Sequence, residues 1–314
     1  MFLGLGTAAL GRPQYINIRQ ENVSNQNLED FKQNGFRVLE EAYRIGIRYF
    51  DTAPGYGLAE NLLLEWVKTK NDPTIHIATK WGYTYVANFD TNAKIHEVKE
   101  HSLTKLNEQW EVSKSFLPYI KVYQIHSATL ETMVLENSVI LERLAFLKET
   151  YNLKIGITTT GANQVEVIKK ALGVSVKGNQ LFDTYQVTYN ILDQSIREVS
   201  EVLDNQKKQL VIKEAMANGR LFENSTYKHY DKLYKVLEML AKKYEVGIDA
   251  IALNFCKCTL PNAKILSGAA SIAHIKQNAQ ATTFRLTTDE ILLLSTFEVD
   301  PTLYWQERKQ LAWN

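Results

Sequence analysis

The stretch Ile47-Arg48-Tyr49-Phe50-Asp51 decides the fold, because it is a short apolar and β-branched run that ends on an ionisable residue. Two further runs, Ile75–Lys80 and Lys121–His126, have the same form and also end on ionisable side chains. Between such runs lie amphipathic stretches, in which apolar residues recur three or four positions apart. Strands that alternate with helices in this way predict right-handed β-α-β units and a parallel sheet.

Eight strands of this kind predict an α/β fold, a single-domain (β/α)8 TIM barrel over residues 1–314, with a C-terminal helix and tail at 286–314. A doubly wound open sheet is the alternative. It is disfavoured because the first turn lacks a phosphate-binding glycine pattern: Ala9 replaces the third glycine, and no helix is expected there. The expected strands are Phe2–Gly6, Ile47–Asp51, Ile75–Lys80, Lys121–His126, Lys154–Thr158, Thr184–Thr188, Gln209–Lys213 and Lys264–Ser267. The expected helices are Phe31–Arg44, Leu58–Thr69, Lys94–Trp110, Leu135–Glu149, Asn163–Leu172, Ile196–Asn205, Tyr227–Tyr244, Ile248–Cys258 and Ile272–Ala281.

The composition is typical of a globular protein, with 45% hydrophobic and 23% charged residues among 314 and a net charge of +1. A balanced charge gives no bulk attraction for nucleic acid or for an anionic membrane, and no apolar run is long enough to span a bilayer. Cys256 and Cys258 are too close for an unstrained disulfide and lack zinc-site spacing, so we expect a cytoplasmic protein without a metal. The oligomeric state is left open.

Three ionisable residues, Asp51, Lys80 and His126, close three consecutive expected strands. Functional side chains of a barrel gather at the carboxyl ends of its strands, so these three are expected to meet. Tyr56 follows Asp51 by five residues, in a glycine-bearing loop short enough to fold over the barrel mouth. Taken singly, each residue has an ordinary structural explanation, such as a helix cap or a solvent-facing charge; together they form a chemically complementary set.

The four groups are suited to giving a proton to an oxygen atom. A tyrosine has a pKa of about 10, and an ammonium roughly 4 Å away is expected to lower that pKa toward neutrality. Asp51 is expected to keep Lys80 ionised, and His126 to donate a hydrogen bond to a carbonyl oxygen as charge develops on it. The missing reactant is a hydride, which implies a nicotinamide cofactor.

The segment Phe50-Asp51-Thr52-Ala53-Pro54-Gly55-Tyr56-Gly57 resembles the hallmark of the aldo-keto reductases, and so do Ala78-Thr79-Lys80 and Gln124-Ile125-His126. The resemblance runs from Leu3 to about Asn278. It implies a (β/α)8 barrel that reduces carbonyls with NADPH, less often NADH. It also implies that the catalytic residues are Asp51, Tyr56, Lys80 and His126.

The resemblance also implies residues for the nicotinamide end of the cofactor. Thr158 and Thr159 stand where the family has Ser and Asn, which hold the nicotinamide carboxamide together with a glutamine that matches Gln186. Thr159 cannot copy an amide that both donates and accepts. Lys213 stands where the family often stacks an aromatic ring under the nicotinamide, and it has Glu214 beside it as an alternative partner.

For the phosphate and adenine end, Gly219 suits a close approach of the backbone to the pyrophosphate. Gly268 and Ser271 lie where the family binds the adenosine phosphate at a helix start, although Ser271 also suits a plain helix cap. Gln277 and Asn278 match the pair that contacts adenine. The Lys or Arg that commonly holds the 2′-phosphate is missing, so NADP is favoured only slightly over NAD.

The substrate site is less well defined. Trp81 and Tyr85 are candidates for its apolar wall, with core packing as the alternative. The polar stretch Gln14–Gln33 is expected in the first loop at the barrel mouth, as a solvated insertion or a lid. The tail Val299–Asn314 carries three aromatic residues and is expected to pack on the barrel, with covering of the active site as the less favoured alternative.

These features favour an NAD(P)-dependent oxidoreductase that acts on a small carbonyl, alcohol or sugar, with Tyr56 as general acid or base. An alternative is a nicotinamide-sensing regulatory protein on the same fold with little turnover. A weaker alternative is an unrelated barrel hydrolase or lyase. Substrate identity and physiological direction stay open at this level, because specificity depends on loops whose shape the sequence does not give.

Overall fold

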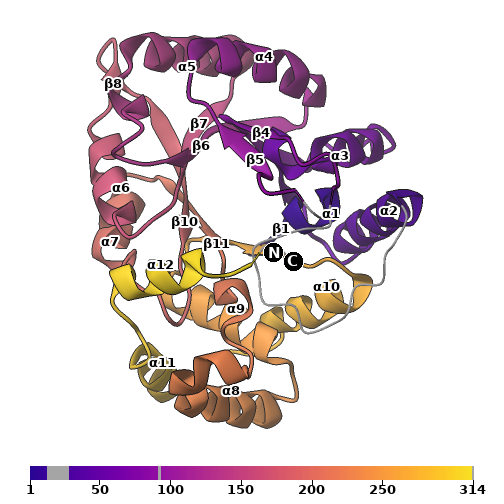
Figure 1. Cartoon of the computed structure of the whole chain (residues 1–314), viewed down its shortest axis with the longest axis vertical. Coiled ribbons are helices and arrows are strands. Elements are labelled where there is room, and N and C mark those ends of the chain that lie inside the picture. Colours follow the sequence, from indigo (N-terminus) through magenta and orange to yellow (C-terminus); the bar gives the residue numbers. More distant parts are fainter. Residues whose placement is uncertain (13–27, 91–92, 313–314) are drawn as a thin grey trace.

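Eight parallel strands close into a barrel in the order β1-β12-β11-β10-β7-β6-β3-β2, and helices surround it (Figure 1). The computed structural model describes residues 1–12, 28–90 and 93–312 of the 314-residue chain. The fold is the expected single-domain (β/α)8 barrel and not an open sheet. The barrel strands are β1 (Leu3–Gly6), β2 (Tyr49–Asp51), β3 (His76–Trp81), β6 (Ile120–Ala128), β7 (Lys154–Thr159), β10 (Phe182–Thr188), β11 (Gln209–Lys213) and β12 (Lys264–Ser267).

The helices pack apolar faces on the outside of this barrel, as the three- and four-residue spacing predicts. Side-chain caps mark several helix starts in the described chain: Ser102 accepts from Lys105 N, Asn137 from Ile140 N, Ser271 from His274 N, Thr287 from Glu290 N and Asp300 from Thr302 N. No described helix is long and apolar enough to cross a membrane. The α-helices are α1 (Ala8–Gly11), α2 (Leu28–Arg44), α3 (Ala59–Lys68), α4 (Leu103–Ser113), α5 (Ser138–Tyr151), α6 (Gln164–Leu172), α7 (Arg197–Asn205), α8 (Asp231–Tyr244), α9 (Ile248–Thr259), α10 (Ile272–Ala279), α11 (Thr288–Ser295) and α12 (Pro301–Lys309).

The barrel interior has an apolar lower layer and a polar upper layer. Five side chains from strands that are not all neighbours form one buried cluster, which requires them to meet inside the barrel: Tyr49, Ala78, Val122, Val211 and Leu266. Side chains alternate along a strand, so residues two positions further on point inward as well. Those residues are Asp51, Lys80, Gln124 and Lys213. The pleat of the barrel thus directs the polar groups into its carboxyl end.

The structure differs from the expected elements in the loop after β3. The helix expected over Lys94–Trp110 is wrong in its first part, because a strand, β5 (Glu97–Lys99), pairs antiparallel with β4 (Tyr83–Tyr85). The helix begins only at Leu103, where Ser102 caps it. A short helix, α1, also follows β1, although none was expected there. Such short elements depend on tertiary contacts, since their own sequences carry little periodicity.

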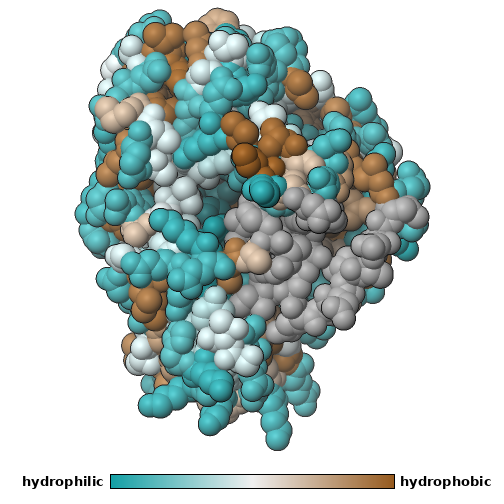
Figure 2. All heavy atoms as spheres, viewed as in Figure 1, coloured by the Kyte–Doolittle hydropathy of each residue, from teal (hydrophilic) through white to brown (hydrophobic). Residues whose placement is uncertain are grey.

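The C-terminal tail contains a helix, α12, which lies across the carboxyl ends of β10 and β11 (Figure 1). Arg308 on α12 forms a bidentate pair with Glu214, the residue after β11, at 2.6 Å between Nη2 and Oε1. Glu307 pairs with Arg220 at 3.0 Å. Figure 2 shows hydrophilic side chains over α12 on this face and hydrophobic ones beside the β4–β5 hairpin. Helix α12 therefore packs on the barrel, as expected, but it does so at the mouth, where only the less favoured alternative placed the tail.

The expected first-loop insertion, Gln14–Gln33, lies mostly outside the described residues. Its last part belongs to α2, which begins at Leu28, three residues before the expected Phe31. The shift follows from Glu29 and Asp30 in the first turn, where acidic side chains stabilise a helix start.

Candidate active site

Asp51, Lys80 and His126 meet at the carboxyl ends of β2, β3 and β6, as expected. Lys80 Nζ lies 2.5 Å from Asp51 Oδ1 and also donates to the carbonyl oxygen of Thr52 at 2.9 Å. The Lys80 side chain has no exposed surface and that of Asp51 only 3%. A buried cation and carboxylate each need a close partner, so this pair fixes both side chains in the barrel mouth.

Tyr56 reaches the same place from a single 3-10 turn, η1 (Pro54–Tyr56), directly after β2. Pro54 starts the turn, and Gly57 ends it with a φ of +62°, a conformation that favours glycine. A Cβ atom on Gly57 would lie 2.5 Å from the carbonyl oxygen of Gly11, and one on Gly11 would lie 1.9 Å from that of Tyr56. The two glycines therefore allow α1 and the tyrosine loop to pack directly on each other.

The four groups form one compact cluster. Lys80 Nζ lies 4.7 Å from the centre of the Tyr56 ring. The Tyr56 and His126 rings meet edge to face, with centroids 5.5 Å apart and an interplanar angle of 87°. The phenol, ammonium, imidazole and carboxylate thus converge from three strand ends and one loop, which is the geometry that the sequence predicts.

Two glutamines extend the cluster inside the barrel. Gln186 Nε2 donates to Asp51 Oδ2 at 2.7 Å, and Gln124 Nε2 lies 3.4 Å from the same oxygen. Gln186, expected at the nicotinamide carboxamide, thus lies at the cluster, where its amide nitrogen binds Asp51. Asp51 therefore accepts from Lys80 on one oxygen and from Gln186 on the other, which leaves it little freedom to rotate.

The pKa of Tyr56 is raised well above its usual value of 10 by burial and by the neighbouring charge of Asp51, while Arg12 partly opposes this rise. We expected the ammonium of Lys80 to lower this pKa toward neutrality, and that expectation is wrong for this structure. The largest cause is burial of the phenol, which disfavours its charged form, and the negative charge of Asp51 adds to the rise. Tyr56 therefore carries its proton at neutral pH.

The pKa of His126 is lowered well below 6.5, first by burial and then by the positive charge of Lys80. The imidazole is therefore neutral at neutral pH and keeps one N–H group to donate. Its Nδ1 atom is buried and has no hydrogen-bond partner among the described residues. The Tyr83 ring packs on the His126 ring, and the two ring centroids are 4.6 Å apart.

The residues expected at the nicotinamide end lie around this cluster but not all face it. Thr158 is adjacent to His126, since its Oγ1 accepts from Ser127 N at 2.7 Å. Thr159 points to the outside of the strand, where its hydroxyl lies 3.3 Å from Gln164 Oε1 on α6. Lys213 donates to Thr188 Oγ1 at 2.9 Å, and burial lowers its pKa. Thr158 and Lys213 thus line the mouth, whereas Thr159 does not.

The residues expected at the phosphate and adenine end gather near α10, apart from Gly219, which follows β11 with a φ of +89°. Gly268 is exposed and has open space where a Cβ would be, and Ser271 caps α10. Gln277 is exposed, but Asn278 is buried, with its side-chain amide 2.7 Å from Ser267 Oγ. The structure therefore does not bring Gln277 and Asn278 to one surface.

The two candidates for the substrate wall lie in different settings. Trp81 has no exposed surface, because it follows the inward-facing Lys80 and so points outward, where its ring meets His101 at 5.4 Å. Of the two roles left open for Trp81, core packing fits this position. Tyr85 is partly exposed in the β4–β5 hairpin, and its hydroxyl accepts from Phe89 N at 3.0 Å.

Sequence reasoning missed Arg12 and Glu97, which hold the tyrosine loop. Arg12 Nη1 donates to Gly55 O at 2.9 Å and pairs with Glu97 at 2.7 Å, and the guanidinium lies 5.5 Å from the Tyr56 ring. No local sequence pattern marked either residue, and Glu97 lay in a stretch that was interpreted as a helix. Only the hairpin brings it beside the loop.

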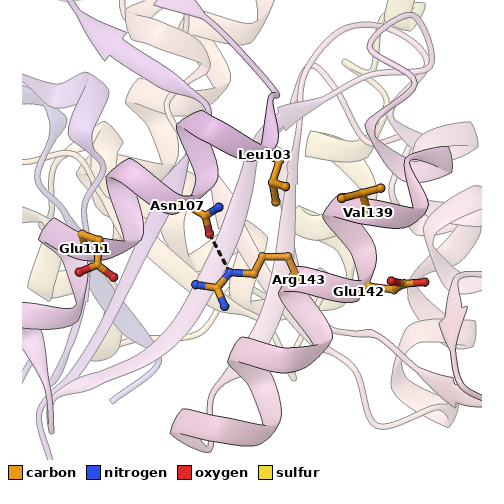
Figure 3. A pocket seen from close by; sticks show the side chains of 6 residues that line it. All are labelled: Leu103, Asn107, Glu111, Val139, Glu142 and Arg143. Atoms are coloured by element: carbon orange, nitrogen blue, oxygen red, sulfur yellow. Dashed lines mark hydrogen bonds between the residues drawn. The ribbon is translucent and has the colours of Figure 1, made fainter.

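One concave region on the outside of the barrel carries no comparable chemistry. A shallow hollow between α4 and α5 is lined by Leu103, Val139 and helix-surface polar residues, with Arg143 bound to Asn107 at 2.7 Å (Figure 3). None of the expected site residues lines it. Across the described ranges, no group of three or more His, Cys, Asp or Glu side chains is placed to hold a metal ion.

A model of the aldo/keto reductase family matches residues 3–297. The chain therefore belongs to the aldo/keto reductase family, a class of oxidoreductases built on this barrel, whose members use nicotinamide cofactors.

Curated relatives and solved structures agree with this assignment. The chain is 23% identical over 301 residues to "Uncharacterized oxidoreductase YqkF" of Bacillus subtilis, covering 88% of this chain and 90% of the relative. It is 25% identical over 302 residues to "Probable aryl-alcohol dehydrogenase AAD4" of Saccharomyces cerevisiae, covering 84% and 88%. Its fold matches the aldo-keto reductase AKR11C1 from Bacillus halodurans with a TM-score of 0.68 and 23% identity, over 94% of this chain and 91% of that one.

Proposed function

We propose that this protein is an NAD(P)-dependent oxidoreductase that transfers a hydride between a nicotinamide and a carbonyl or alcohol carbon, with Tyr56 as general acid or base. The observation that carries the proposal is the convergence of Tyr56 on the buried Lys80–Asp51 pair and on His126. This set can donate and recover a proton at an oxygen atom, and it contains no activated nucleophile.

The residues around the cluster suit a nicotinamide dinucleotide. His126 Nδ1 is a buried atom without a described partner, Thr158 is next to it, and the space around Gly268 is open beside the first turn of α10. Thr158 and Lys213 would hold the nicotinamide end, and Gly268 with the amides of α10 would hold a phosphate. When bound, the cofactor supplies or accepts the hydride.

In the direction of reduction, Tyr56 gives its proton to the substrate oxygen. Its raised pKa keeps the phenol protonated at neutral pH, and His126 donates a hydrogen bond to the same oxygen as negative charge develops. The ammonium of Lys80 and the guanidinium of Arg12 lie close to the Tyr56 ring and offset part of the charge left on it, since each is already paired with a carboxylate. Asp51 and Gln186 keep Lys80 in place. Oxidation of an alcohol uses the same groups in reverse.

For the cofactor, we favour NADPH over NADH. The first turn of α10 carries no acidic side chain, and the exposed His274 and Lys276 lie on this helix. A helix start without carboxylates suits the additional 2′-phosphate of NADPH. For the substrate we favour a small carbonyl compound, alcohol or sugar, in line with the dehydrogenase name of the yeast relative.

The test compares the wild type with Tyr56→Phe in a panel of aldehydes, ketones and sugars. We expect Tyr56→Phe to lower kcat by about 10²-fold or more, because the phenol supplies general-acid catalysis. Binding of NADPH, followed by fluorescence titration, should hardly change, and NADPH should bind more tightly than NADH. Tyr151→Phe is the matched control, since it removes a phenol hydroxyl from α5 on the outside of the barrel.

Unchanged turnover in Tyr56→Phe with normal turnover in Tyr151→Phe would remove Tyr56 from the mechanism. Tight NADPH binding by the wild type without turnover of any substrate would instead favour a regulatory protein that senses the cofactor.

A further inference from the structure

A second concave region lies at the opposite end of the barrel, where the strands begin. This cavity, of about 660 Å³, is lined by residues that open or precede barrel strands, and we call it the floor cavity. His76 opens β3, Lys154 opens β7 and Lys264 opens β12, while Lys207 and Lys208 directly precede β11. Parallel strands all start at the same end of a barrel, so these side chains converge although they are distant in sequence.

The floor cavity has a large excess of positive charge. Its lining contains Arg48 and four lysines, 154, 207, 208 and 264, against a single carboxylate, that of Asp204. Arg48 is paired with Asp72 at 3.0 Å. Within the described part of the chain, no carboxylate lies within 4.0 Å of any of the four lysine ammonium groups. Since the whole protein has a net charge of only +1, this excess is local.

The positive charges around the floor cavity lower the pKa values of basic groups beside them. The pKa of His76 is lowered by burial and then by the charges of Lys121, Lys154 and Lys264, so the imidazole stays neutral at neutral pH. The pKa of Lys264 is lowered by burial and by Lys257. A bound anion would offset the part of each shift that the lysine charges cause, which is the condition for favourable anion binding.

Several cations are held in place by the fold. Lys264 Nζ donates to the carbonyl oxygen of Met1 at 2.9 Å, and Lys208 Nζ donates to that of Phe182 at 2.8 Å. An ammonium group has three N–H donors, so each keeps donors for a ligand. Such anchoring reduces the conformational entropy that the side chains lose when a ligand binds.

The upper wall of the floor cavity provides an uncharged donor. Tyr49 lines the cavity, is only 4% exposed, and its hydroxyl has no hydrogen-bond partner in the described part of the chain. Lys264 Nζ lies 6.0 Å from its ring. Burial raises the pKa of Tyr49, so the phenol keeps its proton as a donor. An unpartnered buried hydroxyl is costly, and a ligand oxygen would satisfy it.

We propose that the floor cavity binds a small multivalent anion, an organic phosphate or a polycarboxylate, through Lys154, Lys264 and the Tyr49 hydroxyl. Its volume falls in the range of about 300–1,000 Å³ that is typical of small-molecule sites, so it can hold a whole metabolite and not only a single ion. The floor cavity is separate from the mouth of the barrel. Anion binding there does not depend on the oxidoreductase activity proposed for the mouth.

The test uses isothermal titration calorimetry with pyrophosphate and with citrate, each in the presence of saturating NADP⁺. The added nucleotide occupies the phosphate-binding region expected at the mouth. We expect Lys154→Gln/Lys264→Gln to weaken binding by about tenfold or more, since charge-assisted hydrogen bonds to an anion are the strong ones. Tyr49→Phe should weaken it by about threefold to tenfold, the effect of one lost hydrogen bond.

Lys235→Gln/Lys242→Gln is the matched control, because it removes two exposed lysines from α8 and leaves the floor cavity intact. It should bind the anions as the wild type does. Binding of only one of the two probes would support the proposal and would identify the ligand as a phosphate or as a polycarboxylate. Binding of neither probe, loss of binding under saturating NADP⁺, or equal losses in the two double variants would each overturn the proposal.

A second measurement is independent of the probe. In low salt without polyvalent anions, Lys154→Gln/Lys264→Gln should raise the urea midpoint of unfolding, because it relieves repulsion, and added pyrophosphate should raise the midpoint of the wild type only. A lower midpoint in the double variant without added anions would mean that these lysines stabilise the fold by themselves, which contradicts an unsatisfied cation cluster.

Discussion

The two ends of the barrel carry charges in opposite ways. At the mouth, nearly every charge is buried beside a partner: Lys80 with Asp51, Arg12 with Glu97 and Arg308 with Glu214. At the floor cavity, four lysines lie without a carboxylate inside ion-pair distance in the described chain. The barrel strands thus end at a rigid cluster whose charges are paired. They begin at a cavity whose four lysines have no carboxylate inside ion-pair distance in the described chain.

This difference separates two uses of charge. Paired buried charges hold side chains in fixed positions before a substrate arrives, which is what a catalytic site requires. Uncompensated charges create a field that a mobile counter-charge can satisfy, which is what an anion site requires. Variants at the mouth should therefore destabilise the fold, whereas removing lysines at the floor cavity should stabilise it.

The largest expected effect is that of Lys80→Met. It leaves the carboxylate of Asp51 buried without its ammonium, and breaking a buried pair from one side costs about 3–5 kcal/mol of unfolding free energy. Urea unfolding of the variant measures this loss. Lys169→Met is the control, because it breaks an exposed pair with Glu198 and should change the stability little. Equal stability of the two variants would contradict a mouth that depends on its ion pair.

A smaller loss is expected for Arg308→Leu, which removes the partner of Glu214. Burial alone would raise the pKa of Glu214, but the charges of Arg308 and Lys213 outweigh it and hold that pKa at about 2. The Arg308 side chain is 18% exposed, so we expect a loss of about 1–3 kcal/mol at neutral pH, in the range for an unsatisfied buried group.

The sign of the pH dependence follows from linkage. A depressed carboxyl pKa stabilises the fold above its ordinary value of 4.5, and this contribution is lost as the pH falls toward 2. The difference in stability between the wild type and Arg308→Leu should therefore shrink toward pH 2. Lys170→Met, in an exposed pair with Glu136, is the control, and its difference from the wild type should stay small at every pH. A difference that stays constant with pH would argue against an ionised Glu214.

The smallest expected effect is that of pH on carbonyl reduction. The required forms are a protonated Tyr56, whose pKa lies well above 10, and a neutral His126, whose pKa lies well below 6.5. Between about pH 6 and 9, kcat with saturating NADPH should vary less than about twofold. Alcohol oxidation, which needs the phenolate, should rise with pH. A steep loss of reduction below pH 7 would show that His126 becomes charged.

The sequence predicted the parts of the site that depend on strand ends. Asp51, Lys80 and His126 each close a strand with a clear apolar pattern, and the barrel order makes these three strands neighbours. Their convergence follows from topology alone. Tyr56 could be placed because Pro54 and Gly57 limit its loop to a single turn.

The rest required contacts between distant segments. Glu97 was assigned to a helix, although it lies in a hairpin that pairs with Arg12 across 85 positions. The direction of the Tyr56 pKa was also wrong, because the burial that raises this pKa is set by the folded chain, and the charge of Asp51 adds to it. Trp81 was left open between the substrate wall and core packing, and only the pleat of the folded strand turns it away from Lys80 into a buried position.

The sequence by itself determined the barrel, the order of its strands and the four groups at its mouth, because hydrophobic periodicity and strand ends are local properties of the chain. Only the tertiary structure decided which charges are compensated. Electrostatic energy depends on distances of a few ångströms and on burial, and both are set by segments far apart in sequence. The paired mouth and the unpaired floor cavity are therefore visible only once the chain is folded.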